Sequence, residues 1–162
     1  MTLQPGDILA WRIGPGASWI DRLIGWGERK TGQPNSDKVN YYHVAIVGPD
    51  ASHYYESAPP GGVQNTIVPA TLPECIEVYR FKEPLTPDEL HKMWTYANAQ
   101  LGKGYNYIGV LTAGYVQIAG KPFCSELVWD ICISATRKLC DWMMCISPDD
   151  DVACPDLTLV PR

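Results

Sequence analysis

The segment from residue 42 to residue 81 constrains the fold most, because short apolar runs alternate there with turns rich in Gly and Pro. The run YHVAIV (42–47) predicts a buried strand, and the turn GPDAS leads the chain back into HYYES as a hairpin. Two further strands are expected at 63–68 and 76–81. Because their connections are short, the segment is predicted to form an antiparallel meander.

The segments before the meander predict a strand and a helix. DILAW (7–11) follows Pro5-Gly6 and is typical of a short strand. ASWIDRLIGWGERKTG (17–32) spaces its apolar residues as a helix does, with Ser18 as a candidate N-cap. The stretch 33–40 is a polar loop, which places it as a rim or lid in front of the strand at 42.

Two helices are expected after the meander. TPDE supplies a capping box with Thr86 at the N-cap and Glu89 at N3, and the apolar stripe runs to Leu101. Pro122 opens a second helix over FCSELVWDICISAT. The stretch 103–121 fits either a loop or an irregular helix, and the tail 147–162 is expected to follow the surface without a regular element.

These elements together predict an α+β fold. The sheet would have about five or six antiparallel strands with helices packed on it. The 162 residues are enough for one hydrophobic core, so residues 1–162 are expected to form a single domain.

Charge and hydropathy exclude several classes of protein. The net charge is -5, and no Lys- or Arg-rich block is present, which argues against nucleic acid as a partner. No apolar run approaches the roughly 20 residues that a transmembrane segment needs. The start MTLQPGDILAW lacks the features of a secretory signal, so the chain is expected to remain in the cytoplasm of the cell that makes it.

The cysteines are expected to be reduced thiols. There are six of them, which would allow disulfides in a secreted protein, but a domain of this size without a signal favours free thiols. The last four cysteines, Cys132, Cys140, Cys145 and Cys154, are not counted as zinc ligands, because they form no C-x-x-C pair and have no histidine near them. We therefore expect neither a metal nor an organic cofactor.

Cys124 is the candidate nucleophile. It lies in the first turn of its predicted helix, where unpaired backbone amides stabilise a thiolate. It also lies on the apolar stripe of that helix with Leu127 and Val128, so a role as a small core residue is the alternative.

His43 is the candidate general base. It precedes an apolar strand, where a plain core position favours Val or Ile over an imidazole that needs hydrogen bonds. The next strand offers His53 and Glu56 to orient the ring, and these two face opposite sides of the sheet. We choose Glu56, because a carboxylate that accepts the imidazole N–H holds the tautomer and stabilises the imidazolium; an exposed strand glutamate is the alternative.

The motifs GDIL (6–9), HVAIVG (43–48), YYESAPPGGV (54–63) and FCSELVW (123–129) occur in this order along the chain. As a set they resemble the circularly permuted branch of the NlpC-like, papain-fold cysteine hydrolases, which is related to the lecithin-retinol acyltransferase-like proteins. In unpermuted members the Cys opens the domain, whereas here the His comes first. Permuted members often have Tyr-Asp before the nucleophile's helix, where this chain has Tyr105-Asn106.

The resemblance implies a permuted papain-like fold with Cys124 as nucleophile, His43 as general base and acid, and Glu56 as the orienting residue. The backbone N–H of Cys124 is the natural first oxyanion donor, and the sequence assigns no second one. Candidate substrate-binding residues are Trp11, Tyr42, Tyr105 and Ser125, and the aromatic residues Trp19, Trp26, Tyr41 and Tyr107 are further candidates for a groove or for the core.

The leading hypothesis is a hydrolase that cleaves an amide or ester through an acyl-enzyme on Cys124. Its substrate would be a small molecule, a lipid or a peptide, such as a peptidoglycan-type peptide or an N-acylated molecule. A lipid acyltransferase or deacylase is the first alternative, with the Trp-rich segment 17–27 as an interfacial helix. The second is a catalytically inactive binding module. A hydrolase without a signal that acts on walls or membranes would be delivered by a phage or a secretion system.

Overall fold

The structure, a computed structural model, describes residues 1–14, 41–111, 118–139 and 147–162. The helix expected over 17–32 and the polar loop at 33–40 lie outside these residues. So do Trp19, Trp26, Cys140 and Cys145.

The core of the fold is an antiparallel sheet in the order β4-β3-β2-β1-β5-β6. Its six strands agree with the predicted number. They are β1 (Ile8–Arg12), β2 (Tyr41–Val47), β3 (His53–Ala58), β4 (Gly62–Ile67), β5 (Ile76–Phe81) and β6 (Leu157–Leu159).

The predicted meander is correct for β2, β3 and β4 but wrong for β5. Strand β5 pairs with β1, with Leu9 opposite Val78, and β1 therefore lies between β2 and β5. The physical reason is the burial of β1: Ile8, Leu9 and Ala10 are inaccessible to solvent. A strand that is apolar on both faces is most stable in the interior of a sheet, where both edges are hydrogen-bonded.

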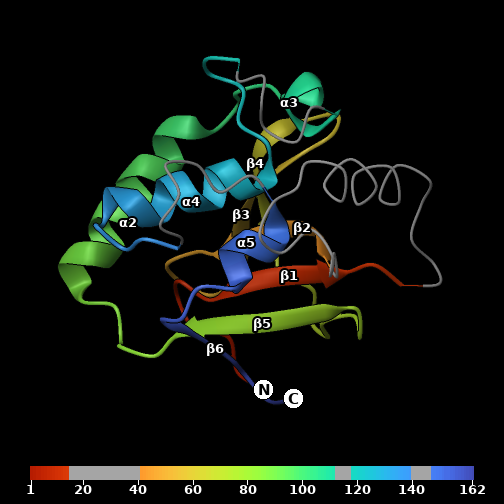
Figure 1. Cartoon of the computed structure of the whole chain (residues 1–162). Coiled ribbons are helices and arrows are strands. Elements are labelled where there is room, and N and C mark those ends of the chain that lie inside the picture. Colours follow the sequence, from red (N-terminus) through yellow and green to blue (C-terminus); the bar gives the residue numbers. More distant parts are fainter. Residues whose placement is uncertain (15–40, 112–117, 140–146) are drawn as a thin grey trace.

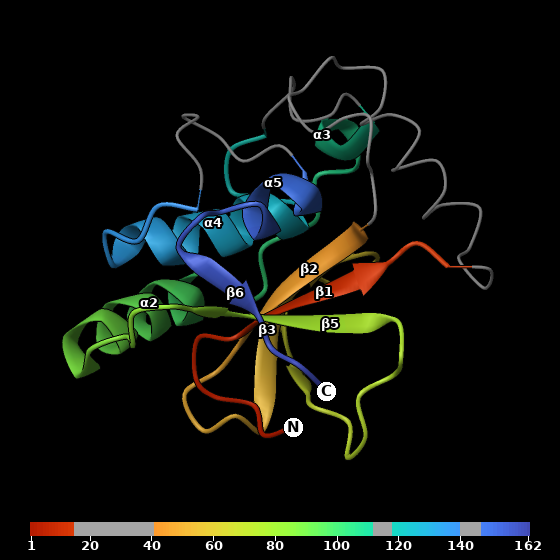
Figure 2. The ribbon, with the colours of Figure 1, turned by 60° about the horizontal axis from the view of Figure 1, so that its bottom comes forward.

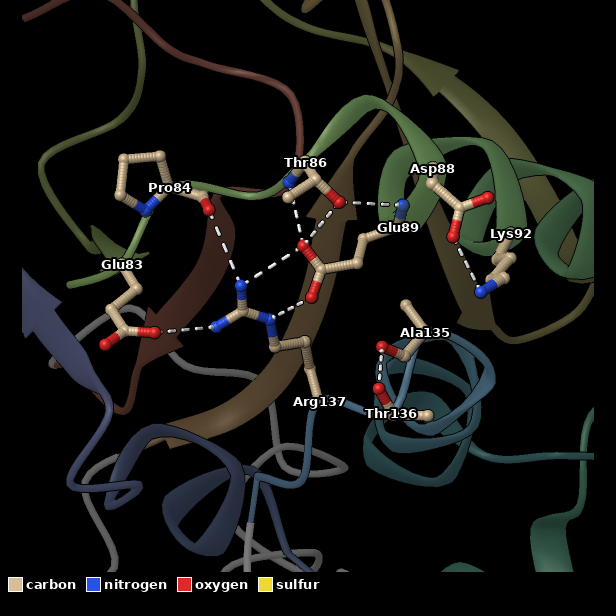
Figure 3. Close-up of polar contacts among 9 residues, drawn as sticks. All are labelled: Glu83, Pro84, Thr86, Asp88, Glu89, Lys92, Ala135, Thr136 and Arg137. Atoms are coloured by element: carbon tan, nitrogen blue, oxygen red, sulfur yellow. Dashed lines mark hydrogen bonds and ion pairs between the residues drawn. The ribbon is translucent and has the colours of Figure 1, made fainter.

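The described helices are α2 (Pro87–Gln100), α3 (Tyr107–Leu111), α4 (Cys124–Ser134) and α5 (Pro148–Val152). Of these, α2 and α4 begin close to where the sequence predicts. Helix α2 starts with the predicted capping box of Thr86 and Glu89. Figure 3 shows that Arg137, just after α4, reaches back to the same Glu89 carboxylate, with Nε donating to Oε1 at 2.7 Å.

The prediction of an irregular C-terminal tail is wrong, because it contains α5 and β6. The Ser147 side chain accepts a hydrogen bond from the Asp150 N–H, and Pro148 occupies the first turn, so α5 has the N-terminal signature of a helix. Strand β6 pairs with β5, with Leu159 opposite Tyr79. Both elements are short, and their stability comes from packing rather than from any apolar period along the chain.

The helices cover one face of the sheet (Figures 1 and 2). Helix α4 packs on β2 and β3, α2 packs on α4, and α5 packs on α4, β2 and β1. The main core lies between these layers and includes Ile8, Val44, Met93, Leu127 and Ile131. A second apolar cluster on the opposite face comprises Leu9, Ala45, Val47, Tyr54, Ile76 and Val78. The two chain ends lie close together (Figure 1).

None of the helices in the described ranges is long and apolar enough to cross a membrane.

Candidate active site

The site lies where β2 and β3 separate. Among the described residues the ladder between these strands is confined to two pairs, Ile46 with Tyr55 and Val47 with Tyr54. Beyond them the segment that leads into α4 is bound to β3, because the Ser57 hydroxyl donates to the Pro122 carbonyl at 2.6 Å. The first residue of α4 is Cys124, which is thereby held against the open end of the two strands.

His43 on β2 and Glu56 on β3 form a buried hydrogen-bonded pair. The His43 Nε2 lies 2.8 Å from Glu56 Oε2, and the two side chains are 15% and 9% exposed. His43 is two positions from Ala45 on β2, and Glu56 is two positions from Tyr54 on β3, and both of these neighbours belong to the second apolar cluster. Because side chains alternate along a strand, His43 and Glu56 leave the sheet on that same face. Glu56 therefore lies beside His43, whereas His53 bonds through Nδ1 to Ser52 at 2.7 Å in an exposed turn.

The Glu56 carboxylate has two further hydrogen-bond donors. Gln64 Nε2 and the Thr66 hydroxyl donate to its Oε1 at 2.9 and 2.6 Å. Burial of Glu56 favours the neutral acid, but the bond to His43, the charge of His43 and these two donors together lower the pKa of the carboxyl below its usual value. Glu56 is therefore a carboxylate at neutral pH.

Cys124 begins α4, as the sequence predicts, and is only 5% exposed. The N-cap residue of α4 is Phe123, whose side chain has no acceptor for the first amides of the helix. The reverse bond is present, from the backbone of the N-cap residue to the side chain of Glu126. Its Oε2 accepts from the Phe123 N–H at 3.4 Å, which is a long and weak bond. The first amides of α4 thus surround the sulfur with partial positive charge.

The charges of His43 and Cys124 depend on each other. Burial opposes protonation of His43, but hydrogen bonds to Cys124 and Glu56 outweigh it and raise the pKa of His43 to about 9. Burial likewise opposes the Cys124 thiolate, yet the bond to His43, its charge, and the backbone groups of Val44 and Ser125 lower the pKa of the thiol. Each charge therefore stabilises the other: the imidazolium favours the thiolate, and the thiolate favours the imidazolium. Because Nε2 faces Glu56, the other ring nitrogen, Nδ1, is the one left for Cys124.

Trp11 packs against the His43 ring and against Tyr54. The centroid of Trp11 lies 4.9 Å from that of His43 and 5.7 Å from that of Tyr54. Trp11 itself is partly exposed. The structure thus gives Trp11 a contact with the candidate base, and its predicted contact with a substrate stays a prediction.

The other predicted substrate-binding residues are mostly buried. Tyr105 is 7% exposed and packs edge-on against Tyr107, and Ser125 is 0% exposed. Tyr42 is partly exposed at the start of β2. Tyr41, a further aromatic candidate, is buried and bonds through its hydroxyl to Glu77 and Tyr79. Contact of these residues with a substrate stays a prediction, while Tyr41 belongs to the packed core.

Sequence reasoning missed Ser57, Gln64 and Thr66. A signal for the last two exists in hindsight, since they share one face of a strand and follow a hairpin-like turn after Glu56. Their pairing with Glu56 depends on the register, however, and a shift of one residue turns both side chains to the other face. Ser57 carries no signal, because its partner Pro122 is distant in the sequence.

No group of three His, Cys, Asp or Glu side chains within the described ranges is arranged to hold a metal ion.

Comparisons with known proteins reveal a fold-level similarity. No family model matches the chain, and the curated proteins contain no match to it. Among solved structures, the crystal structure of metalloprotein yiiX from Escherichia coli O157:H7, designated DUF1105, is similar, with a TM-score of 0.67 and 20% identity. The similarity covers 100% of this chain and 98% of that one. At this identity the likeness shows that the two chains share an α+β fold.

Proposed function

We propose that this protein is a cysteine hydrolase of the circularly permuted NlpC-like type, which cleaves an amide or ester bond through an acyl-enzyme on Cys124. One observation carries the proposal: His43 Nε2 lies 2.8 Å from the buried Glu56 carboxylate, and His43 and the thiol that begins α4 shift each other's pKa toward the charged forms. A nucleophile, a base and a group that orients the base are the parts that this chemistry needs.

The first half of the reaction forms a thioester. The Cys124 thiolate attacks the carbonyl carbon of the substrate, and the backbone N–H of Cys124 stabilises the oxyanion that develops. The His43 imidazolium then gives its proton to the leaving amine or alcohol as the bond to carbon breaks. The acyl group remains on the sulfur, and His43 is neutral.

The second half releases the acid. Neutral His43 takes a proton from water, the resulting hydroxide attacks the thioester, and the thiolate leaves. His43 is again the imidazolium, and the product is a carboxylic acid. Glu56 stays ionised throughout, because it accepts hydrogen bonds at both oxygens. The proposed substrates are a peptidoglycan-type peptide or an N-acylated molecule; an acyltransferase would share the first half and replace water by another acceptor.

The test is alkylation of each cysteine by iodoacetamide between pH 5 and pH 9, quantified by peptide mass spectrometry. An ordinary thiol has a pKa of about 8.5 and loses reactivity below that pH. Because the pKa of Cys124 is lowered, Cys124 should stay reactive below that pH and lose reactivity only as the pH falls through its own pKa. The exposed Cys75 is the internal reference. His43→Ala should abolish the reactivity at low pH.

A second measurement follows the acyl-enzyme directly. Incubation with an activated ester such as p-nitrophenyl acetate should add one acyl group to the wild type and none to Cys124→Ala, as read from the intact mass. If Cys124 reacts only after denaturation, or reacts equally well in His43→Ala, the protein is not a thiol hydrolase of this kind. It would then fit an inactive binding module.

A further inference from the structure

The carboxylate of Glu56 is held by the neighbouring strand. In the register of β3 and β4, Glu56 lies directly opposite Gln64, and Thr66 is the diagonal neighbour, opposite Tyr54. All three side chains leave the sheet on one face. Both donors go to the same oxygen: Gln64 Nε2 at 2.9 Å and the Thr66 hydroxyl at 2.6 Å reach Oε1, and Oε2 is left for His43.

This division of the two oxygens determines the direction of the carboxylate. A carboxylate turns easily about its last bond, but two donors on one oxygen hold its plane. The bond from Thr66 has the length of a charge-assisted O–H···O⁻ bond, which is about 2.5–2.7 Å. Glu56 Oε2 is therefore aimed at His43 Nε2 before any substrate binds.

The bonds of Gln64 and Thr66 to Oε1, and of His43 to Oε2, also determine the protonation states of Glu56 and His43. A proton on Oε1 would meet the donor hydrogens of Gln64 and Thr66, and a proton on Oε2 would meet the hydrogen of His43 Nε2. All three contacts are satisfied when Glu56 is ionised and His43 carries its proton on Nε2. Nδ1 is then the nitrogen that exchanges a proton with Cys124.

We propose that Thr66 and Gln64 are positioning residues that hold Glu56 ionised and aimed at His43, and that they thereby determine how far the Cys124 thiolate persists below neutral pH. This inference rests on the proposed function, and it adds two residues of β4 to the site. Neither residue touches the reacting atoms, since each acts through Glu56 and His43.

Three other titratable groups near the site have raised pKa values. Tyr54, beside Glu56, has a pKa raised to about 12 by burial and by the Glu56 charge. Asp151 on α5 faces the charge of Cys124, and burial first, then that charge, raises the pKa of its carboxyl well above the usual range. Burial first, and then the charge of Asp130, raise the pKa of Glu126 in the first turn of α4 to about 7, against the hydrogen bond from the Phe123 N–H. Glu126 therefore titrates in the same range as the site, and its contribution is common to the wild type and to every variant of β4.

The experiment measures the pH profile of Cys124 alkylation in four variants of the full chain. Thr66→Val keeps the shape of the side chain and removes the donor, and Gln64→Leu removes the other donor. Thr66→Ser restores a hydroxyl. Asn65→Ala is the matched control, because this exposed residue lies between the two on β4. Near-ultraviolet circular dichroism shows which variants are folded.

The midpoint of the profile should rise by about one pH unit in Thr66→Val and in Gln64→Leu, as expected for the loss of a charge-assisted hydrogen bond. Thr66→Ser and Asn65→Ala should match the wild type. Titration of the His43 ring by NMR should show its pKa falling in the first two variants, which a merely structural defect would not produce. If Thr66→Val does not fold, Gln64→Leu decides the question.

Two failures are distinguishable. If the wild type and His43→Ala differ as proposed, but both donor variants keep the wild-type profile, this inference is wrong and the proposed function stands. If Cys124 of the wild type is not activated at all, the proposed function and this inference fall together.

Discussion

At the scale of single residues, the site depends on the face to which each side chain points. His53 and Glu56 are both near His43 in sequence, and the alternation of β3 alone separates them. Glu56 shares the face of His43, whereas His53 turns to Ser52. The choice of Glu56 from the sequence rested on this alternation and on the chemistry of a carboxylate, and the structure places Glu56 at His43.

Ser57 offers a residue-scale prediction. Its hydroxyl, in a residue that is 0% exposed, bonds the Pro122 carbonyl two residues before Cys124. In Ser57→Ala that carbonyl would be buried without this donor, so we expect the free energy of unfolding to fall by about 1–2 kcal/mol. Cys124 alkylation at pH 6.5 should slow, because the start of α4 loses its anchor to β3.

Urea unfolding and site-resolved alkylation measure the two effects of Ser57→Ala. Ser52→Ala is the control, since Ser52 is exposed and bonds within its own turn. Unchanged stability together with unchanged alkylation would show that the bond between Ser57 and Pro122 does not hold the nucleophile's helix.

At the scale of elements, local signals predicted α2 and α4 well. A capping box begins α2, Pro122 comes just before α4, and both helices have an apolar period. The short elements α5 and β6 were missed, because five and three residues carry no measurable period. The order of the strands also could not be predicted, since pairing of β5 with β1 rather than β4 is a contact between distant parts of the chain.

The start of α2 offers an element-scale prediction. Thr86 accepts from the Glu89 N–H at 3.3 Å, and Glu89 returns a bond to the Thr86 N–H at 2.8 Å (Figure 3). Thr86→Ala removes the first of these bonds and should lower the free energy of unfolding by about 1 kcal/mol. The midpoint of the alkylation profile should not move, because the His43–Glu56 pair keeps its partners.

Chemical denaturation tests Thr86→Ala against Thr71→Ala, a change at an exposed loop position. Equal stability of the two variants would mean that the capping box adds nothing to α2. A shift of the alkylation profile in Thr86→Ala alone would reveal coupling between the start of α2 and the site.

At the scale of the whole molecule, one buried carboxylate ties the start of β1 to β5. Asp7 is 1% exposed, and Arg80 donates to both of its oxygens at 2.7 Å. The Gln4 N–H adds a third bond at 2.8 Å. Asp7 belongs to the GDIL motif, which runs into the first two residues of β1. This position suits a structural role in the sheet.

Asp7→Asn offers a whole-molecule prediction. The change removes a charge that faces Arg80, so we expect the free energy of unfolding to fall by about 2 kcal/mol. Cys124 should keep its alkylation profile while the protein is folded. Glu83→Gln is the control, because Glu83 is an exposed partner in a 3.8 Å ion pair with Arg137 and should cost almost nothing. Equal stability of the two variants, measured in urea, would refute the role of Asp7.

The sequence by itself determined the α+β class, strands β1 to β5, helices α2 and α4, and the position of Cys124 at a helix start, because these depend on residues close together in the chain. The tertiary structure alone decided the place of β1 between β2 and β5, and the two donors that Gln64 and Thr66 offer to Glu56. Such contacts depend on strand order and register. These follow from how all the apolar faces are buried together, which no local pattern encodes.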